Sequence, residues 1–214
     1  LIELITGDNP LAYQSDISLF GRKRGTGESI WDIKKNIGML STAFHMEFTD
    51  YSDNSVRAYG HTRRGISTWE VVCSGFTDSI GLYSTIGSRE QRIAKQWVRC
   101  FNLEDLCNFP KENMGQSSTN ILLRQQQQMR QSHLQNFFTL SHGQQKLVLL
   151  CRAVVKNPLL LLLDEPTHGL SYDNRDRLLF MLKQLSERKD IAIVYVTHRQ
   201  EELDFLNFRN VLRL

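Results

Sequence analysis

The chain has 214 residues, a length that suits one domain or one domain with an inserted subdomain. Apolar residues make up 41% of it, enough for a hydrophobic core, while a formal net charge of +3 gives no charge-based reason to expect nucleic acid binding. The longest aliphatic run, residues 159–163, is far shorter than the roughly 20 residues of a membrane-spanning helix, and no charged-then-apolar leader precedes a cleavage site, so export is not expected.

Residues 1 to about 47 alternate short strand signals with turns. The strand signals lie at 17–20 and 37–40, and the loop GRKRGTGES stands between them at 21–29. From residue 68 to 139 the pattern becomes helical, because STWEVVCSGF begins with a Ser/Thr cap and REQRIAKQWVRCFNL repeats apolar residues at helical spacing. The shared face of this second segment carries Ile93, Trp97, Cys100 and Phe101.

Two polar segments fit neither pattern. FTDYSDNSVRAYGHTRRG at 48–65 is aperiodic, and KENMGQSSTNILLRQQQQMRQSHLQ at 111–135 is rich in glutamine without a clear apolar face. Both are expected to be surface insertions, with a partner-binding helix as the alternative for the second. The cysteines form no C-x-x-C pair and are expected to be free and mostly packed inside: Cys73, Cys100, Cys107 and Cys151.

From residue 140 onward, helices alternate with apolar strands. We expect helices at 143–156 and 175–188, and strands at 159–163, 191–197 and 210–214. Such alternation is typical of a buried parallel sheet in an α/β fold.

Charged and polar side chains follow two of these strands at the point where each strand ends. Asp164 and Glu165 come directly after five leucines, and Thr197 and His198 end the next strand, IAIVYVTHR. The carboxyl ends of the strands form the ligand crevice of open α/β sheets, so these groups are expected to meet there. Phosphoryl chemistry uses such a set: one carboxylate for Mg²⁺, a second for the attacking water, and an imidazole for the phosphate.

A second candidate feature is the turn Ser141-His142-Gly143-Gln144, which opens an amphipathic helix. Free backbone N–H groups at a helix N-terminus, together with the helix dipole, make an anion site. Each feature alone has a simpler explanation: Ser141 as a helix cap, Asp-Glu-Pro as a turn, and His198 as a surface histidine. Their order, with strand, helix and strand between them, favours a shared site.

In this order the motifs resemble those of the ATP-binding cassette (ABC) ATPases. LSHGQQ resembles their signature motif, LLLLLDEP their Walker B strand, and VTHR their switch-histidine strand. The resemblance covers essentially all 214 residues, and the middle region resembles the helical subdomain. A finer resemblance is to the cassettes of tandem ATP-binding proteins associated with bacterial molybdate transport. The segments that carry it are LITGDNPLAYQSDISLFGRKRGTGESIWDIKKNIG, VVCSGFTDSIGLY and the closing VTHRQEEL…VLRL.

The resemblance implies an α/β fold, a P-loop NTPase-like, mostly parallel sheet with an inserted helical subdomain. Residues 1–67 would be the N-terminal part of the nucleotide-binding core, 68–139 the helical subdomain, and 140–214 the signature, Walker B and switch-histidine part of the core. It implies ATP and Mg²⁺ as cofactors, with Asp164 as the metal residue and Glu165 and His198 as catalytic residues. Ser141, Gly143 and Gln144 would contact ATP held by a second cassette.

The P-loop of the family, G-x-x-x-x-G-K-[ST], does not occur in these residues. The loop GRKRGTGES has Gly and Lys but no Gly-Lys-Ser/Thr, and we expect it to be a connection between strands. Relatives continue from their P-loop with Leu-Leu-x-Leu-Ile-Thr-Gly, which resembles residues 1–7, so the P-loop would end just before Leu1. The expectation is therefore an N-terminally truncated chain that is inactive alone, with a naturally degenerate cassette as the alternative.

Two positions depart from the family pattern. Thr42 stands where relatives usually carry a glutamine that touches Mg²⁺, so we take Thr42 as the cofactor-contacting residue of that loop. Ser171 stands where an aspartate usually follows the Walker B turn, and Asp173, two residues on, is the candidate substitute.

The function implied for the parent protein is ATP hydrolysis coupled to transport, with molybdate as the cargo of the finer resemblance. The implied partners are a second cassette and a membrane permease, and the implied location is cytoplasmic, at most peripheral on the inner face of a membrane. The alternative is a non-catalytic regulatory cassette that acts as a protein-interaction module. No nucleic acid partner is expected, because the net charge is weak and no long basic helix is present.

Overall fold

A computed structural model describes residues 2–27, 29–48, 66–107 and 135–212. The two predicted insertions therefore lie outside the described residues except for their ends. One of these ends, Phe48, closes a helical segment at 42–48 and is fully buried, so the polar segment begins after it and not with it.

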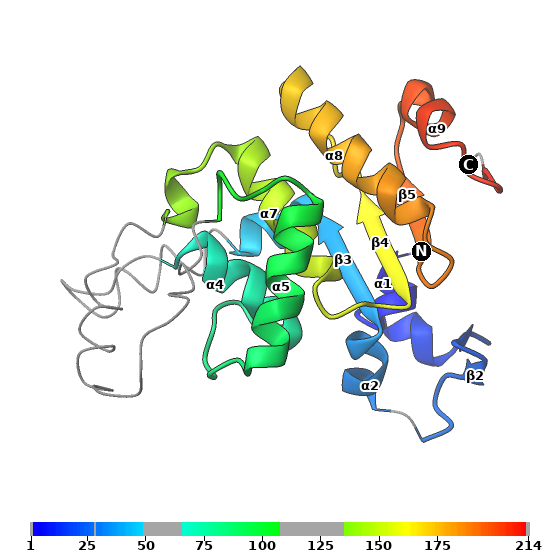
Figure 1. Cartoon of the computed structure of the whole chain (residues 1–214). Helices are drawn as coiled ribbons and strands as arrows, with labels where there is room; N and C mark the ends of the chain where they lie inside the picture. Colours follow the sequence, from blue (N-terminus) through cyan, green and yellow to red (C-terminus); the bar gives the residue numbers. More distant parts are fainter. Residues whose placement is uncertain (1, 28, 49–65, 108–134, 213–214) are drawn as a thin grey trace.

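Within the described residues, the centre of the fold is a parallel sheet in the order β3-β4-β5 (Figure 1). The strands are β3 (Ile37–Ser41), β4 (Leu160–Asp164) and β5 (Ala192–Val196). The first four residues of the middle strand β4 are buried, because helices and neighbouring strands surround it. The α/β class and the parallel sheet predicted from the sequence are confirmed.

The strands are in a register that brings their carboxyl ends level. Ser41 of β3 pairs with Asp164 of β4, and Asp164 pairs with Val196 of β5. The chain thus leaves all three strands at one edge, where the next residues are Thr42, Glu165 and Thr197.

Helices and short elements complete the described fold. The helices are α1 (Ile2–Thr6), α2 (Ile30–Lys35), α4 (Thr68–Cys73), α5 (Ser88–Cys100), α7 (His142–Val154), α8 (Tyr172–Ser186) and α9 (Gln200–Leu206). The 3₁₀ turns are η1 (Pro10–Tyr13), η2 (Ser74–Phe76) and η3 (Phe137–Thr139), and the strands β1 (Ser18–Leu19) and β2 (Arg22–Lys23) form an antiparallel hairpin. The loop GRKRGTGES is thus partly strand and turn, and Arg24 within it donates to the carbonyls of Leu4 and Ile5 at 2.7 and 2.6 Å.

One predicted strand is wrong. Residues 210–212 form no strand, and residues 213–214 lie outside the described part of the chain. Val211 and Leu212 are exposed, so this apolar run has neither a neighbouring strand nor a hydrophobic surface to hold it in a sheet.

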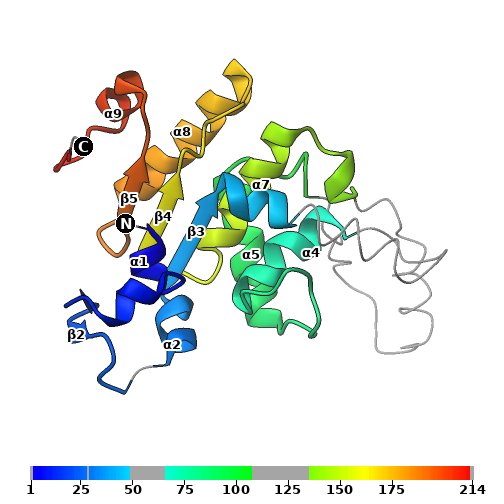
Figure 2. The same ribbon diagram turned by 180° about the vertical axis from the view of Figure 1, so that it is seen from behind.

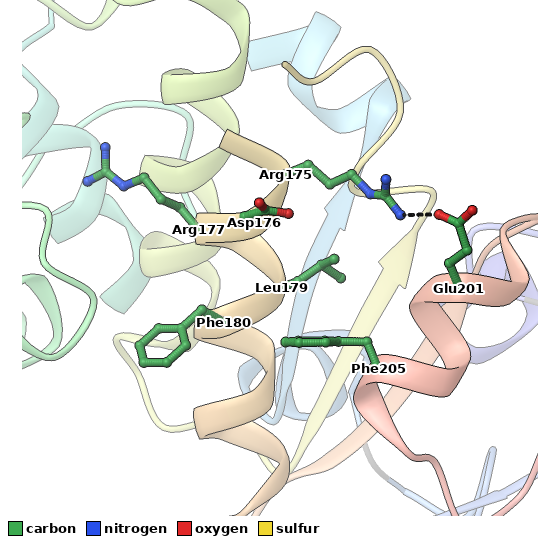
Figure 3. Close-up of a pocket in the computed structure, with 7 residues that line it drawn as sticks. All are labelled: Arg175, Asp176, Arg177, Leu179, Phe180, Glu201 and Phe205. Atoms are coloured by element: carbon green, nitrogen blue, oxygen red, sulfur yellow. Dashed lines mark hydrogen bonds and ion pairs between the residues drawn. The ribbon is translucent and has the colours of Figure 1, made fainter. Parts of the chain in front are cut away.

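Alternate residues of β4 point to the two faces of the sheet. Leu161 and Leu163 join the main core with α7 and α8, and Leu160 and Leu162 join a smaller cluster with Ile33 of α2. The helix α8 crosses in front of the sheet in Figure 1, and α1 lies in front in the view from behind (Figure 2). α8 also lies beside α9, where Arg175 and Glu201 form an ion pair at 3.1 Å (Figure 3).

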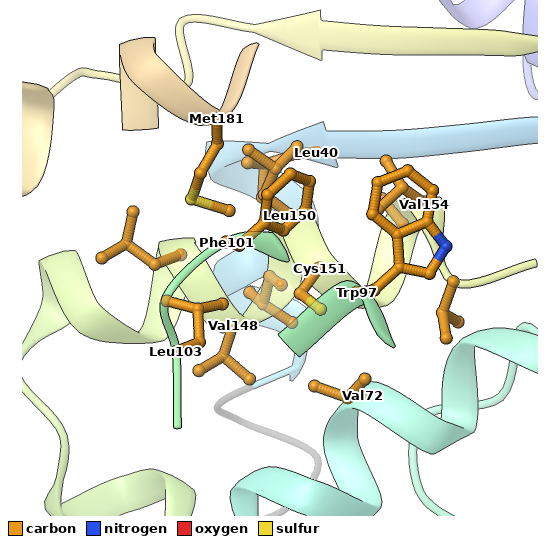
Figure 4. Close-up of a cluster of buried hydrophobic side chains, with 14 of the residues drawn as sticks. Leu40, Val72, Trp97, Phe101, Leu103, Val148, Leu150, Cys151, Val154 and Met181 are labelled. Atoms are coloured by element: carbon orange, nitrogen blue, oxygen red, sulfur yellow. The ribbon is translucent and has the colours of Figure 1, made fainter. Parts of the chain in front are cut away.

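Helix α7 is the central element of the main core. It is buried along nearly its whole length after the first residue, and it packs against β3, α4 and α8. Figure 4 shows its side chains Val148, Leu150 and Val154 among residues of α4, α5 and α8. Cys73, Cys107 and Cys151 are buried free thiols as expected, whereas Cys100 is exposed, so it was wrong to place it on the buried face of α5.

A close approach of β3 to α7 makes a first testable prediction. A Cβ atom at Gly38 would lie 2.4 Å from the backbone oxygen of Ala153, so α7 would have to move away from the sheet. We expect Gly38→Ala to lower the free energy of unfolding by about 1–3 kcal/mol in urea titrations. The matched substitution is Gly87→Ala, whose Cβ would meet a flexible carboxylate of Glu90 at 3.4 Å. Equal losses for the two variants would contradict the close packing of α7 on β3.

Candidate active site at the carboxyl edge of the sheet

The backbone at the end of β4 sets the position of Glu165. Glu165 has a φ of +44°, in the left-handed region, and its N–H donates to the carbonyl of Val196 at 3.0 Å. A non-glycine residue in this region carries strain, and such strain gathers at functional sites. Glu165 is therefore held across the ends of β4 and β5, directly after Asp164.

Glu165 and His198 meet at this edge. The Nδ1 atom of His198 lies 3.1 Å from Oε1 of Glu165, within hydrogen-bonding distance. Their side chains are 62% and 41% exposed, so a solute can reach both groups. The predicted meeting of these two side chains, which are 33 residues apart, is confirmed.

Thr42 lies at the same edge, on the β3 side. It is half-buried and begins the helical segment 42–48, in which the N–H of Phe44 donates to Oγ of Ser41 at 3.0 Å. Ser41 is in register with Asp164, so a serine lies beside a half-buried carboxylate at the strand ends, and Thr42 follows directly in the chain.

The turn at 141–144 has a local structure of its own. Ser141 caps α7: its Oγ accepts from the N–H of Gln144 at 3.3 Å, and Oε1 of Gln144 accepts from the N–H of Ser141 at 3.0 Å. A Cβ atom at Gly143 would lie 2.6 Å from Nδ2 of Asn174, so this glycine allows α7 to pack against α8. Ser141 remains exposed at the helix N-terminus. The turn is thus a true helix cap with an exposed hydroxyl residue.

Lys146 is a buried residue that the sequence analysis missed. Its Nζ donates to the carbonyl of His168 at 2.8 Å, which ties α7 to the turn after β4. Burial lowers the pKa of Lys146, and the nearby Glu165 carboxylate opposes that shift. The sequence signal that could have identified Lys146 is its place directly before the apolar run LVLLC.

Glu202 of α9 is the second missed residue, and its side chain is fully buried. Its Oε1 accepts from Thr167 and Arg175, and its Oε2 accepts from Tyr195 and Thr197. Burial by itself would raise the pKa of Glu202, but the hydrogen bonds from Tyr195, Thr167 and Thr197 and the charge of Arg175 outweigh it, so the pKa is lowered. Glu202 is therefore a buried carboxylate at pH 7.

A hollow of about 600 Å³ between α8 and α9 is separate from this edge. Neither Glu165 nor His198 belongs to its lining, which includes the exposed aromatic rings of Phe180 and Phe205 (Figure 3). Arg175 and Arg177 also line the hollow, and Arg175 is paired there with Glu201.

The oxygen groups at the edge fit a magnesium site in which the substrate supplies some of the metal ligands. The described residues contain no group of three or more His, Cys, Asp or Glu side chains that could hold a metal ion by themselves. Mg²⁺ is usually bound through one or two carboxylates together with water and substrate phosphates. Asp164, with Ser41 in register beside it and Thr42 next in the chain, would supply that smaller set.

Comparison with known proteins identifies the family. The profile of the ABC transporter family matches residues 1–168. The chain therefore belongs to this family of ATP-binding cassettes. No helix in the described ranges has the length and apolar character needed to cross a membrane.

Individual relatives agree with this family. The chain is 34% identical over 202 residues to the ABC transporter ATP-binding protein ModF of Escherichia coli (strain K12), a match that spans 94% of the chain and 33% of ModF. It is 27% identical to the zinc uptake system ATP-binding protein ZurA of Listeria monocytogenes, over 86% of the chain and 55% of ZurA. A solved structure, the dimeric cassette MJ0796 bound to ADP and Pi, shares the fold with a TM-score of 0.51 and 18% identity, over 87% of this chain and 64% of that one.

The buried Glu202 predicts a pH-dependent stability. Since its pKa is lowered in the folded chain, its stabilising contribution is present at neutral pH and is lost as the pH falls below its ordinary value of 4.5. We expect Glu202→Gln to cost about 3 kcal/mol of unfolding free energy at pH 7 and clearly less at pH 3. The matched control is Glu201→Gln, an exposed partner of the same Arg175, which should cost no more than about 1 kcal/mol. A Glu202→Gln loss of equal size at both pH values would contradict a buried, ionised Glu202.

Proposed function

We propose that the sheet edge serves the hydrolysis of ATP, within a longer protein that couples hydrolysis to transport. The observation that carries the proposal is the hydrogen-bonded pair of Glu165 and His198, which lies directly beside Asp164. Membership of the ABC transporter family supports the nucleotide as the substrate. The division into residues 1–67, 68–139 and 140–214 and a cytoplasmic location belong to the same proposal.

In this proposal each side chain has a separate task. Asp164, with the hydroxyl of Thr42, would hold Mg²⁺, which when bound would neutralise charge on the phosphate oxygens. Glu165 orients the attacking water and accepts its proton. His198 contacts Glu165 through Nδ1, which leaves its Nε2 for the phosphate.

The signature turn acts on a second cassette. Ser141, Gly143 and Gln144 would cap ATP bound to the P-loop of the partner, and the exposure of Ser141 at the N-terminus of α7 supports contact with an anion there. The similar cassette MJ0796 is described as dimeric, which supports a two-cassette arrangement. A membrane permease is the further partner of a transport function.

The cargo is the finest part of the proposal. Molybdate is proposed on the residues that resemble molybdate-associated cassettes, and similarity to ModF over nearly the whole chain is the supporting comparison. The zinc uptake relative names another cargo at lower identity.

Turnover tests the role of Glu165. A version of the chain preceded by a G-x-x-x-x-G-K-[ST] segment should hydrolyse Mg-ATP, and Glu165→Gln should lower the rate at least about 100-fold through loss of the proton acceptor. The control is Glu187→Gln, an exposed glutamate after α8, which should hydrolyse at the unsubstituted rate. Absence of turnover in the unsubstituted version would favour a non-catalytic interaction module.

Nucleotide affinity tests the missing P-loop. The 214 residues lack the Gly-Lys-Ser/Thr that grips the phosphates, so the chain alone should bind Mg-ATP more weakly than about 1 mM in calorimetric titration. Submillimolar binding at a single site would show that another part of the chain holds the nucleotide.

A further inference from the structure

The buried carboxylate of Glu202 lies between the two loops that carry Glu165 and His198. Its Oε1 accepts from Thr167 at 2.8 Å, and Thr167 follows Glu165 by two residues. Its Oε2 accepts from Thr197 at 2.9 Å, and Thr197 directly precedes His198. One rigid group therefore holds a hydroxyl from each loop, one on each of its oxygens.

Two further donors fix the carboxylate itself. Tyr195 of β5 donates to Oε2 at 2.5 Å, and Arg175 of α8 donates to Oε1 at 3.2 Å. The side chain of Arg175 is only 14% exposed, so its charge is largely enclosed with that of Glu202. Four elements or loops thus converge on one carboxylate.

We propose that Glu202 is a positioning residue that holds Glu165 and His198 in register across the ends of β4 and β5. The inference rests on the proposed function of this pair. Glu202 touches neither side chain; it acts through Thr167 and Thr197, whose backbones continue into the two loops. It keeps the 3.1 Å separation of the pair without entering the solvent-exposed site.

A carboxylate suits this role because every group that faces it is a donor. The hydroxyl of Thr197 already accepts from the N–H of Arg199 at 3.1 Å, so its hydrogen is directed to Glu202. A glutamine at 202 would present an NH₂ group to two of these donors and would leave the exposed Glu201 as the remaining carboxylate partner of Arg175. We therefore expect Glu202→Gln to disturb both loops despite its equal size.

The turn after β4 is held from its other side as well. Lys146 of α7 donates to the carbonyl of His168, and the N–H of His168 donates to the carbonyl of Glu165 at 3.0 Å. With Lys146 in place, loss of the Thr167 contact should shift the turn and not unfold it. The variants Thr167→Val and Thr197→Val, which keep side-chain shape, release one loop each.

Nuclear magnetic resonance of the full 214-residue chain tests the positioning directly. The Glu165→Gln variant is the reference, because it gives the ring signals of His198 when the carboxylate partner is absent. We expect Glu202→Gln and Thr197→Val to move the ring ¹⁵N signals of His198 toward those values, and Thr167→Val to move the backbone amides of residues 165–168. If Glu202→Gln does not fold, the two threonine variants carry the test.

Two controls distinguish the loss of positioning from a general destabilisation of α9. Glu201→Gln removes the same charge from the same helix, beside the same Arg175. Leu206→Val weakens the packing of a buried residue of α9 without touching the hydroxyls. Both should leave the His198 ring signals unchanged, even where the melting temperature falls. Wild-type His198 signals in Glu202→Gln and Thr197→Val, or an equal shift in Leu206→Val, would overturn the proposal.

Kinetics distinguishes this inference from the proposed function. In the version with a G-x-x-x-x-G-K-[ST] segment, Glu202→Gln should lower kcat roughly 10- to 100-fold and leave KM for ATP within about 2-fold, since misplacement affects the reacting groups more than binding. If kcat is unchanged in Glu202→Gln while turnover is abolished in Glu165→Gln, the positioning role of Glu202 is contradicted and the proposed function is not. Full turnover in Glu165→Gln would sink the proposed function, while the resonance shifts would still decide the role of Glu202.

Discussion

A buried carboxylate is costly unless donors surround it, and Glu202 meets this constraint with groups from across the fold. Its partners come from β5, from α8, and from the turns that follow β4 and β5. Removing such an ion from water costs several kcal/mol, so the folded chain is stable only when these partners are in place. The same contacts that satisfy Glu202 also fix the backbone on which Glu165 and His198 stand. Stability and site geometry therefore depend on one group.

The parallel sheet supplies the frame for this arrangement. The register of β3, β4 and β5 brings three strand ends level, and the close packing of α7 on Gly38 keeps this helix against the same sheet. Lys146 then links α7 to the turn after β4. The turn is held on two sides, by α7 and by α9, which explains how Glu165 can keep a left-handed backbone conformation while its side chain remains exposed to solvent.

Much of this architecture could be predicted from the sequence, because its signals are local. The run of five leucines predicts β4. Because the carboxyl ends of parallel strands lie at one edge of a sheet, the sequence also predicts that Glu165 and His198 meet there. The exception at 210–212 shows the limit of local signals, since an apolar run forms a strand only beside a partner. Glu201 and Glu202 are a second example of this limit. They are adjacent in the sequence, but only Glu202 is buried, because of the way α9 is turned and because Arg175, 27 residues away, approaches it.

The most direct test of the central claim is a pair of crystal structures, of the unsubstituted chain and of Glu202→Gln. The account predicts that Oε1 of Glu165 and Nδ1 of His198 stay 3.1 Å apart in the first. In the variant they should separate beyond about 3.5 Å, the limit of a hydrogen bond, with residues 165–168 displaced. Two structures with the same separation and the same turn would contradict the account.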